Sequence, residues 1–149
     1  VFPGTQGGPL MNIIAAKAQC YLEASKPSFR HYAAKVITNA ECLARSLTDA
    51  GYKIVTGGTD SHIVLLDLSD KFISGKYAAN ILEEHGITVN KNGIPNDPRS
   101  FVETSGIRMG TAAETTRGRD NKWFYNLGEK IATILNEAME KNTKKVQVG

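Results

Sequence analysis

The sequence predicts an α+β fold, or α/β sandwich, in which a small and mostly antiparallel sheet has helices on one face. The first observation is size and composition: 149 residues, 41% hydrophobic and 22% charged, are typical of one compact globular chain. The second is that segments with helical spacing of apolar residues alternate with short β-rich runs. They follow the order helix, helix, strand, strand, helix, strand, strand, helix, with no internal repeat.

Two helices open the chain after a glycine-rich start. The first begins at Met11 and is expected to stop near Ser25, because the residue before Pro27 avoids the helical region. The second resumes at Ser28 and ends before Gly51, a residue suited to a left-handed C-terminal cap.

The middle of the chain alternates strands with one helix. Tyr52–Thr56 and His62–Leu68 are β-rich runs separated by turn residues. A helix follows, capped by Ser74 and closed by Gly86. Ile87–Asn90 is expected to be a brief strand.

The last third combines a loop, a strand and a long helix. Turn-forming residues are dense in Lys91–Arg99, which predicts a shaped loop. Phe101–Met109 is expected to be a strand, and the polar stretch Thr115–Asp120 to start a helix that continues to about Ala138. Gly128 should cost that helix about 1 kcal/mol relative to alanine.

Composition excludes several classes of protein. The formal net charge of +3 is scattered, which argues against a nucleic-acid surface. No apolar run approaches the roughly 18 residues of a membrane span. Cys20 and Cys42 sit in helical sequence without metal-ligand spacing, so we expect small buried thiols in a reducing compartment, the cytoplasm, and no metal site. The chain opens on Val1 without a secretory signal, like a sequence entered in the middle.

Three groups of residues could bind a ligand. Gly4, Gly7 and Gly8 before a helix suit a phosphate, or form a plain turn and cap. Arg108, flanked by small residues on a strand, suits a carboxylate, or is a solvated surface arginine. Asn92, with Asn90, suits a heterocyclic amide, or bonds the backbone of its own turn.

Other chemistry is not supported. Asp60, Ser61 and His62 are the residue types of a hydrolase triad, but neighbours on an extended chain point to opposite faces. His31 and His85 are isolated from other metal-ligand types.

Four longer motifs occur in a fixed order along the chain. They are Val1-Phe2-Pro3-Gly4-Thr5-Gln6-Gly7-Gly8-Pro9-Leu10-Met11, Gly57-Gly58-Thr59-Asp60-Ser61-His62, Gly86-Ile87-Thr88-Val89-Asn90-Lys91-Asn92, and Thr104–Thr111 with Thr115-Thr116-Arg117-Gly118. Together they resemble serine hydroxymethyltransferase, a pyridoxal-phosphate enzyme, over the length from Val1 to about Met139. The resemblance implies the C-terminal third of a subunit of the aspartate-aminotransferase fold type I. Residues 1–25 would end the large domain, 26–141 form the small C-terminal domain, and 142–149 a frayed tail.

The resemblance also implies site residues. Arg108 matches the arginine that holds the carboxylate of serine or glycine. Gly8, with Gly7 as a weaker companion, matches the glycine that meets the cofactor phosphate of the neighbouring subunit in a homodimer or higher homo-oligomer. The cofactor lysine of that family lies in an upstream His-Lys-Thr motif absent here, so the chain alone is expected to be inactive and to contain no catalytic residue.

The co-substrate tetrahydrofolate would meet another part of the chain. Asn92 matches the asparagine that faces the pterin ring, and Ser100, Phe101 and Val102 fall where the family contacts the same molecule. The family commonly has Ser-Pro-Phe-Val-Thr-Ser-Gly here. This chain instead has Ser100-Phe101-Val102-Glu103-Thr104-Ser105-Gly106, which lacks the proline of that motif and carries the acidic Glu103.

Two further hypotheses remain open from the sequence. The chain could be a stand-alone, non-enzymatic small-molecule or regulatory module, since α+β sandwiches of this size often serve so. It could also be a short paralogue that pairs with a full-length partner.

Overall fold

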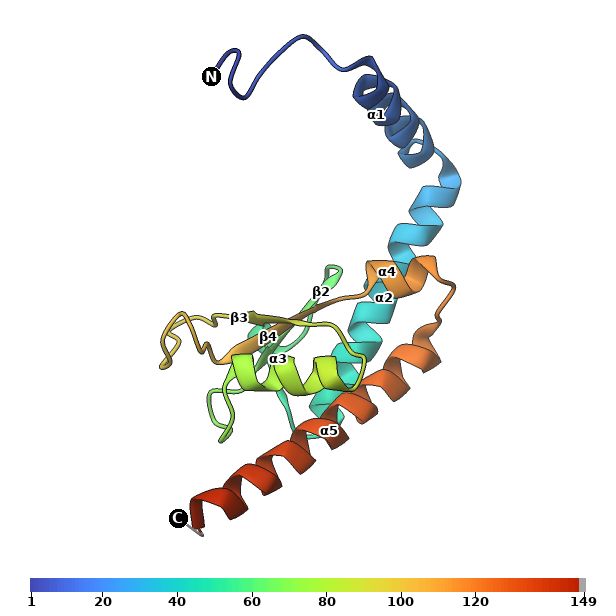
Figure 1. The fold of residues 1–149 in the computed structure, drawn as a ribbon. Helices are drawn as coiled ribbons and strands as arrows, with labels where there is room; N and C mark the ends of the chain where they lie inside the picture. Colours follow the sequence, from blue (N-terminus) through green and yellow to red (C-terminus); the bar gives the residue numbers. More distant parts are fainter. Residues whose placement is uncertain (148–149) are drawn as a thin grey trace. The chain divides into compact units, whose positions relative to one another are not determined.

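A computed structural model describes residues 1–147, with the side chains of residues 1–142 (Figure 1). The chain divides into two compact units, the first Val1–Ala34 and the second from Lys35 onward. The predicted order of helices and strands is confirmed, with two short helices added. The elements are α1 (Met11–Ala24), α2 (Pro27–Asp49), β1 (Lys53–Ile54), the 3-10 helix η1 (Val55–Gly57), β2 (Ile63–Asp67), α3 (Gly75–Glu84), β3 (Asn90–Asn92), β4 (Gly106–Gly110), α4 (Ala112–Thr116) and α5 (Asn121–Gln147).

The first unit contains the extended opening, α1 and the start of α2. α1 follows Leu10, which makes no side-chain cap. The helix ends at Ala24, and the C-cap residue Ser25 follows, whose N–H donates to the Tyr21 carbonyl and whose hydroxyl donates to the Leu22 carbonyl. The predicted end of the first helix is therefore confirmed.

The second unit is built on a four-stranded antiparallel sheet of order β1-β2-β4-β3. In the pairing of β2 with β4, Val64 faces Met109 and Leu66 faces Ile107. All four side chains are buried, and because side chains alternate along a strand they share one face. The predicted sheet with helices on one face is confirmed.

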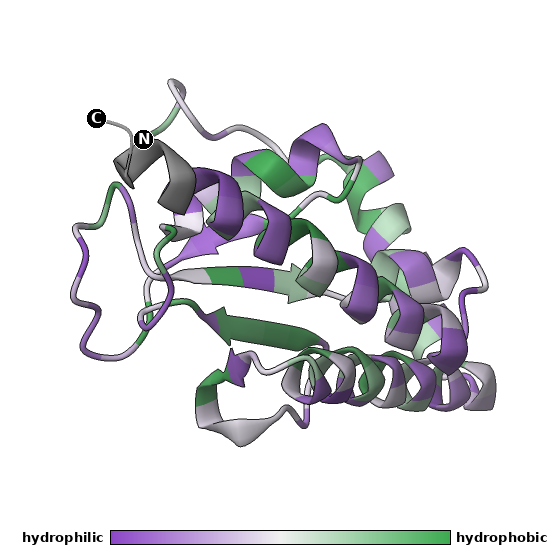
Figure 2. Ribbon diagram, turned by 90° about the horizontal axis from the view of Figure 1, so that it is seen from below, coloured by the Kyte–Doolittle hydropathy of each residue, from purple (hydrophilic) through white to green (hydrophobic). Residues whose placement is uncertain are grey.

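Helices α2, α3 and α5 complete this core. Figure 2 shows hydrophobic residues along β2 and in part of β4, and alternating hydrophobic and hydrophilic residues along the helices. This alternation lets each helix bury one stripe against the sheet. The buried helical residues include Ala40, Leu43, Leu47, Ala78, Leu82, Phe124, Ile131 and Leu135.

Gly128 has a packing role that its sequence context does not reveal. A Cβ at this position would lie 2.5 Å from the Ser46 hydroxyl oxygen on α2. The same hydroxyl donates to the Tyr125 carbonyl of α5 at 2.7 Å. The glycine therefore lets α2 and α5 approach closely, which offsets its low helix propensity.

The strand predicted at Ile87–Asn90 is wrong in position. The N–H of Ile87 donates to the Leu82 carbonyl and so completes the turn that ends α3. The ladder with β4 begins only at Asn90, so β3 is Asn90–Asn92. β3 thus contains the last residue of the expected strand, Asn90, and the first two residues of the expected loop, Lys91 and Asn92.

The strand predicted at Phe101–Met109 is too long at its start. The N–H of Thr104 donates to the Ser100 carbonyl, so the chain turns there and β4 begins at Gly106. Phe101 and Val102 remain exposed. The apolar character of Phe101 and Val102 favoured a strand in the sequence pattern, but nothing in this unit buries either side chain.

The C-terminal region also differs from expectation. Thr115 and Thr116 belong to the separate helix α4, and Asp120 caps α5 by accepting from the Trp123 N–H at 2.9 Å. α5 reaches Gln147, so residues 142–147 of the expected frayed tail are helical, and residues 148–149 lie outside the described part. The domain boundary expected after residue 25 stays a prediction. The division of the chain into two compact units falls between Ala34 and Lys35, within the sequence of α2.

Candidate functional site

Arg108 lies at the centre of β4. It pairs with Leu65 of β2 on one side and with Asn90 of β3 on the other. Its neighbours Ile107 and Met109 are buried against the helices, so the exposed Arg108 side chain belongs to the opposite face. We call this the outer face, defined by Leu65, Asn90 and Arg108. Among the side chains that the structure describes, none makes a hydrogen bond or ion pair with Arg108, so its guanidinium is available to a ligand.

Asn92 lies on the same side of the sheet as Asn90 and Arg108. Residues two apart on a strand share a face, so β3 places Asn90 and Asn92 together. The Asn92 amide nitrogen donates to the Gly93 carbonyl at 2.7 Å. The amide nitrogen of Asn92 thus bonds the backbone of its own turn, which was one of the two alternatives left open from the sequence. The amide oxygen of Asn92 remains available to another donor.

The segment Gly93–Ser105, which we call the β3–β4 loop, is held by Asp97. This carboxylate accepts from three backbone N–H groups: Ile94 at 3.2 Å, Arg99 at 2.9 Å and Ser105 at 2.9 Å. Burial raises the pKa of Asp97, but the hydrogen bonds from Ser105, Arg99 and Ile94 outweigh it and lower the pKa to about 2. Asp97 is therefore ionised at neutral pH.

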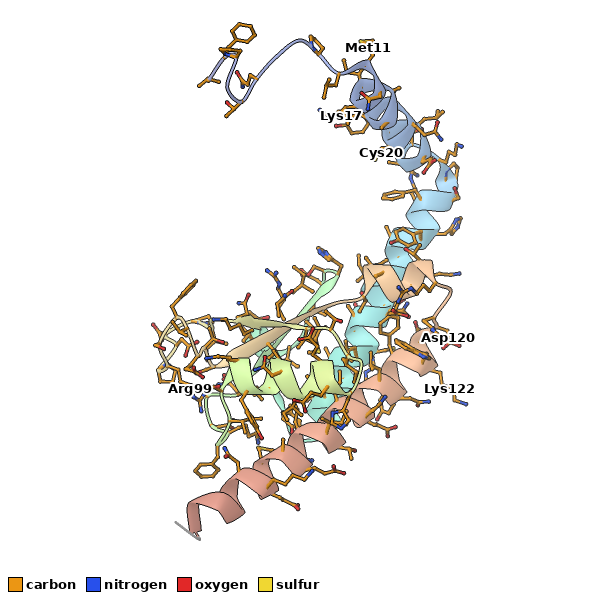
Figure 3. All side chains as sticks on the ribbon, in the orientation of Figure 1. Met11, Lys17, Cys20, Arg99, Asp120 and Lys122 are labelled. Atoms are coloured by element: carbon orange, nitrogen blue, oxygen red, sulfur yellow. The ribbon has the colours of Figure 1, made fainter. Side chains whose placement is uncertain are left out.

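Arg99 ties the same loop to the end of β2. Its guanidinium donates to the Leu68 carbonyl at 3.1 Å, the Lys71 carbonyl at 2.7 Å and the Ser105 hydroxyl at 2.9 Å. Figure 3 labels Arg99 beside the loop, near the start of α3. The planar fork of arginine suits several fixed acceptors at once.

The tip of the loop is Ser100–Val102. The Lys91 ammonium donates to the carbonyls of Phe101, at 3.3 Å, and Val102, at 2.6 Å. It also lies 5.8 Å from the centre of the Phe101 ring. The Phe101 side chain is 92% exposed, so the tip presents an uncovered aromatic ring.

Glu103 joins the loop to the start of α3. Its carboxylate accepts from the Ser74 hydroxyl and the Lys76 ammonium, each at 2.9 Å. These hydrogen bonds, from Lys76 first and then Ser74, lower the pKa of Glu103. Glu103, the acid that departs from the family motif, therefore links the β3–β4 loop to the first turn of α3.

Gly7 and Gly8 belong to the first unit. Both are exposed, and a Cβ on either would meet nothing within 4 Å. Among the described residues no hydrogen bond is made by either backbone N–H. The first turn of α1 begins only at Met11, so the two glycines precede the helix rather than form its first turn.

The structure brings only some of the predicted site residues together. Arg108 and Asn92 share the outer side of the sheet, whereas Ser100, Phe101 and Val102 lie on the loop beyond β3. The sequence did not single out Asp97, Arg99 or Lys91 for a role. The spacing Asp97-Pro98-Arg99 was a usable signal, because an aspartate beside a proline commonly bonds nearby backbone in turns.

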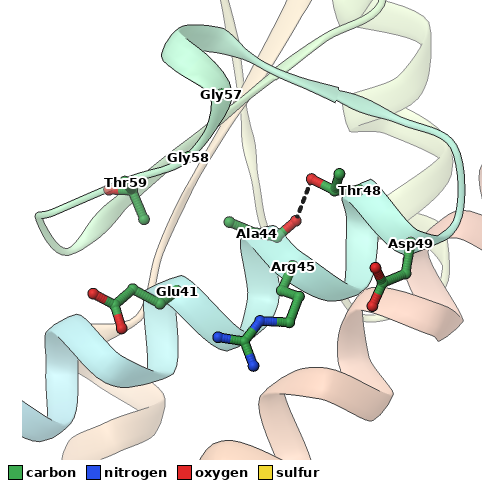
Figure 4. A pocket seen from close by; sticks show the side chains of 8 residues that line it. All are labelled: Glu41, Ala44, Arg45, Thr48, Asp49, Gly57, Gly58 and Thr59. Atoms are coloured by element: carbon green, nitrogen blue, oxygen red, sulfur yellow. Dashed lines mark hydrogen bonds between the residues drawn. The ribbon is translucent and has the colours of Figure 1, made fainter.

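The grooves elsewhere on the second unit contain none of these residues. Figure 4 shows one between α2 and η1, with Glu41, Arg45 and Asp49 on one wall and Gly57–Thr59 on the other. Another, of ≈ 630 Å³, lies beside Trp123 at the end of β4.

In the described part of the chain no three His, Cys, Asp or Glu side chains gather as metal ligands. Nor does any described helix combine the length and apolar character needed to cross a bilayer.

The structure thus defines an α+β domain in which Arg108, without a partner among the described side chains, and two asparagines lie on the outer side of an antiparallel sheet. The family profile described as "Serine hydroxymethyltransferase" matches residues 1–131. The chain is 56% identical to "Serine hydroxymethyltransferase" of Rickettsia massiliae over 136 residues, 91% of this chain and 32% of the relative. It is 54% identical to "Probable serine hydroxymethyltransferase" of Rickettsia bellii over 149 residues, 99% of this chain and 36% of the relative.

The chain belongs to the serine hydroxymethyltransferase family. It spans about a third of the length of the relatives that it matches. The predicted family membership is confirmed.

Proposed function

We propose that this chain acts as the C-terminal part of a glycine hydroxymethyltransferase. The complete enzyme would transfer the hydroxymethyl carbon of serine to tetrahydrofolate, which yields glycine and methylenetetrahydrofolate. One observation carries the proposal: Arg108 is exposed at the centre of β4, with no partner among the described side chains.

Arg108 would hold the carboxylate of serine or glycine. A guanidinium binds a carboxylate through two parallel hydrogen bonds, which fixes orientation as well as position. The flanking strands make the arginine's backbone rigid, because β4 pairs with β2 on one side and β3 on the other. A fixed carboxylate restricts how the reacting carbon of the amino acid is presented.

The opening glycines fit the phosphate of pyridoxal phosphate. The backbone around Gly7 and Gly8 is exposed and unobstructed, so its N–H groups can approach an anion closely. In a homodimer or higher homo-oligomer, Gly8 and then Gly7 would contact the cofactor of the neighbouring subunit. The cofactor supplies an electron sink when bound. No lysine of this chain lies in a His-Lys-Thr context, so the attachment lysine would belong to the preceding part of the enzyme and the chain alone would be inactive.

Tetrahydrofolate would lie against Asn92 and the loop tip. The free amide oxygen of Asn92 can accept from a pterin N–H, and the exposed Phe101 ring offers an apolar surface. Ser100 and Val102 flank that ring. The carboxylates of Asp97 and Glu103 are already bonded within the loop and its neighbours.

The enzyme would work in the cytoplasm. The support is that Cys20 and Cys42 are both free thiols, as a reducing compartment favours. The burial predicted for them is wrong, because Cys20 is exposed and Cys42 only partly buried.

The first experiment substitutes Arg108 in a complete polypeptide that contains this chain. We expect Arg108→Ala to lower kcat/KM for serine by on the order of 100-fold, chiefly through KM, since a charged group would lose its partner. Arg108→Lys should recover only part of the loss, because a point charge cannot bind bidentately.

Arg45→Ala is the matched control. Arg45 is an exposed arginine of α2 away from the sheet's outer face, and its loss should leave serine kinetics unchanged. An Arg108→Ala variant with wild-type serine kinetics would refute the proposed role. Measurable turnover by the 149-residue chain alone, with added cofactor, would refute its dependence on a preceding part.

A further inference from the structure

We propose that Asp97 and Arg99 are positioning residues that hold the β3–β4 loop in the shape that presents Ser100–Val102 to the pterin co-substrate. This inference rests on the proposed function and adds residues that touch no substrate. It predicts a specific kinetic effect on tetrahydrofolate, separate from any effect on serine.

Asp97 joins the two ends of the loop. The Ile94 N–H lies just after β3 ends, and the Ser105 N–H lies just before β4 begins, yet both donate to the same Asp97 oxygen. The other oxygen accepts from the Arg99 N–H. A single carboxylate therefore sets the width of the loop at its base. Its pKa of about 2 keeps this tie ionised throughout the pH range of an assay.

Arg99 joins the loop to a neighbouring segment. Its contacts with the carbonyls of Leu68 and Lys71 fix the loop to the residues that follow β2. The Leu68 N–H in turn donates to the Ser105 carbonyl at 2.7 Å. Both ends of the loop and the end of β2 thus form one hydrogen-bonded unit.

Burial does not hold the tip. Lys91 bonds the tip carbonyls directly, and Asp97 and Arg99 fix the base of the loop from which the tip extends. Phe101 is 92% exposed and Val102 is 59% exposed. Position 101 has no proline ring to restrict the backbone. A tip without burial or a proline has to be ordered by its anchors, and a ligand that binds a disordered tip bears the entropic cost of ordering it.

Arg108 does not depend on the same ties. It sits within β4, where backbone hydrogen bonds to β2 and β3 fix its position. Loosening the loop should therefore weaken folate binding and leave the serine carboxylate contact intact. This separation distinguishes a positioning role from a general loss of structure.

The test uses Asp97→Asn in the complete, cofactor-loaded enzyme. Asparagine keeps the shape but turns one acceptor into an N–H donor that faces other N–H donors. We expect KM for tetrahydrofolate to rise about tenfold, while kcat and KM for serine stay within about twofold. Backbone hydrogen exchange in residues 98–104 should accelerate in the unliganded variant.

Arg99→Gln is the second variant and Asp49→Asn the control. Arg99→Gln removes the tie to Leu68 and Lys71 and should raise the same KM. Asp49 also joins two elements through a carboxylate, by accepting from the Tyr125 hydroxyl at 2.9 Å, but it does so on the helical side. Asp49→Asn should leave KM for tetrahydrofolate unchanged.

The outcomes separate this inference from the proposed function. An unchanged KM for tetrahydrofolate in both loop variants would overturn the inference alone. Equal rises of KM for serine and tetrahydrofolate would also overturn it, because they would show general structural damage. A wild-type enzyme without tetrahydrofolate-dependent turnover would overturn the proposed function itself.

Discussion

The two units of the chain differ in how they are stabilised. None of residues 1–34 is buried, and α1 exposes Met11 at 69% and Tyr21 at 72%. The second unit instead encloses a core in which Leu66, Phe124 and Leu135 are almost fully buried. Burial of apolar surface is the main favourable term in folding, so the second unit has its own source of stability.

This difference separates helix formation from helix stabilisation. The apolar spacing in α1 predicts a helix correctly, but α1 buries none of those residues. A 14-residue helix is marginal in water without packing. Substitutions in the two units should therefore differ sharply in their effect on the free energy of unfolding.

The largest contrast is expected between two apolar truncations. Phe124→Ala removes a ring from the centre of the core and should lower the free energy of unfolding by about 3–5 kcal/mol. Leu22→Ala, on the exposed surface of α1, should change it by less than about 0.5 kcal/mol. Urea unfolding of the chain, followed by Trp123 fluorescence, measures both. Equal losses would show that α1 shares the core's cooperative unfolding.

The next contrast compares two glycines. A Cβ at Gly75 would lie 2.2 Å from the Gly106 carbonyl oxygen, so Gly75→Ala should cost about 1–3 kcal/mol by forcing α3 away from β4. Gly8→Ala meets no atom and should leave the stability of the chain unchanged. In the complete enzyme, Gly8→Ala should nevertheless weaken cofactor binding. Thermal unfolding and cofactor titration separate the two effects, and a destabilised Gly8→Ala chain would contradict this prediction.

A smaller contrast concerns helix caps. The Ser74 hydroxyl accepts from the Tyr77 N–H at the start of α3, and Ser74→Ala should cost about 1 kcal/mol. α1 lacks such a cap, because Leu10 occupies the corresponding position. Leu10→Ser should raise the helicity of residues 11–24 in circular dichroism. Unchanged helicity in Leu10→Ser would show that the missing N-cap hydrogen bond does not limit the formation of α1.

The smallest effect is expected from acid. The folded-state pKa of Asp97, about 2, lies below its ordinary value of 3.8, so its stabilising contribution is complete above about pH 4 and is lost as the pH falls toward 2. The free energy of unfolding of Asp97→Asn should therefore change less than that of the wild type across this window. Urea titrations between pH 2 and pH 5 test the sign. A steeper pH dependence of the free energy of unfolding in Asp97→Asn than in the wild type would contradict this prediction.

Local patterns predicted most of the helices and turns. Pro27 marked the break between α1 and α2, and Ser74 and Gly86 marked the two ends of α3. These features depend on neighbours in the chain, so the sequence is enough. The strands around the site were predicted less well, since the exposed Phe101 and Val102 have the composition of a strand without its pairing.

The site followed the same division. Arg108 was predicted as a candidate from its residue type and its small neighbours, and Asn92 from its place in a turn, and both roles stay predictions. Their relative placement required the register in which Asn90 pairs with Arg108. No local pattern specifies that pairing, because β3 and β4 are separated by the whole loop.

By itself, then, the sequence determined the order of elements, the ends of the first three helices, and an arginine suited to a carboxylate. Only the tertiary structure decided that Gly128 brings α2 and α5 together and that Asp97 and Arg99 hold the β3–β4 loop. The physical reason is that these contacts join residues far apart in the sequence. Arg99 and its Leu68 acceptor are 31 positions apart, and such contacts form only after distant segments have packed.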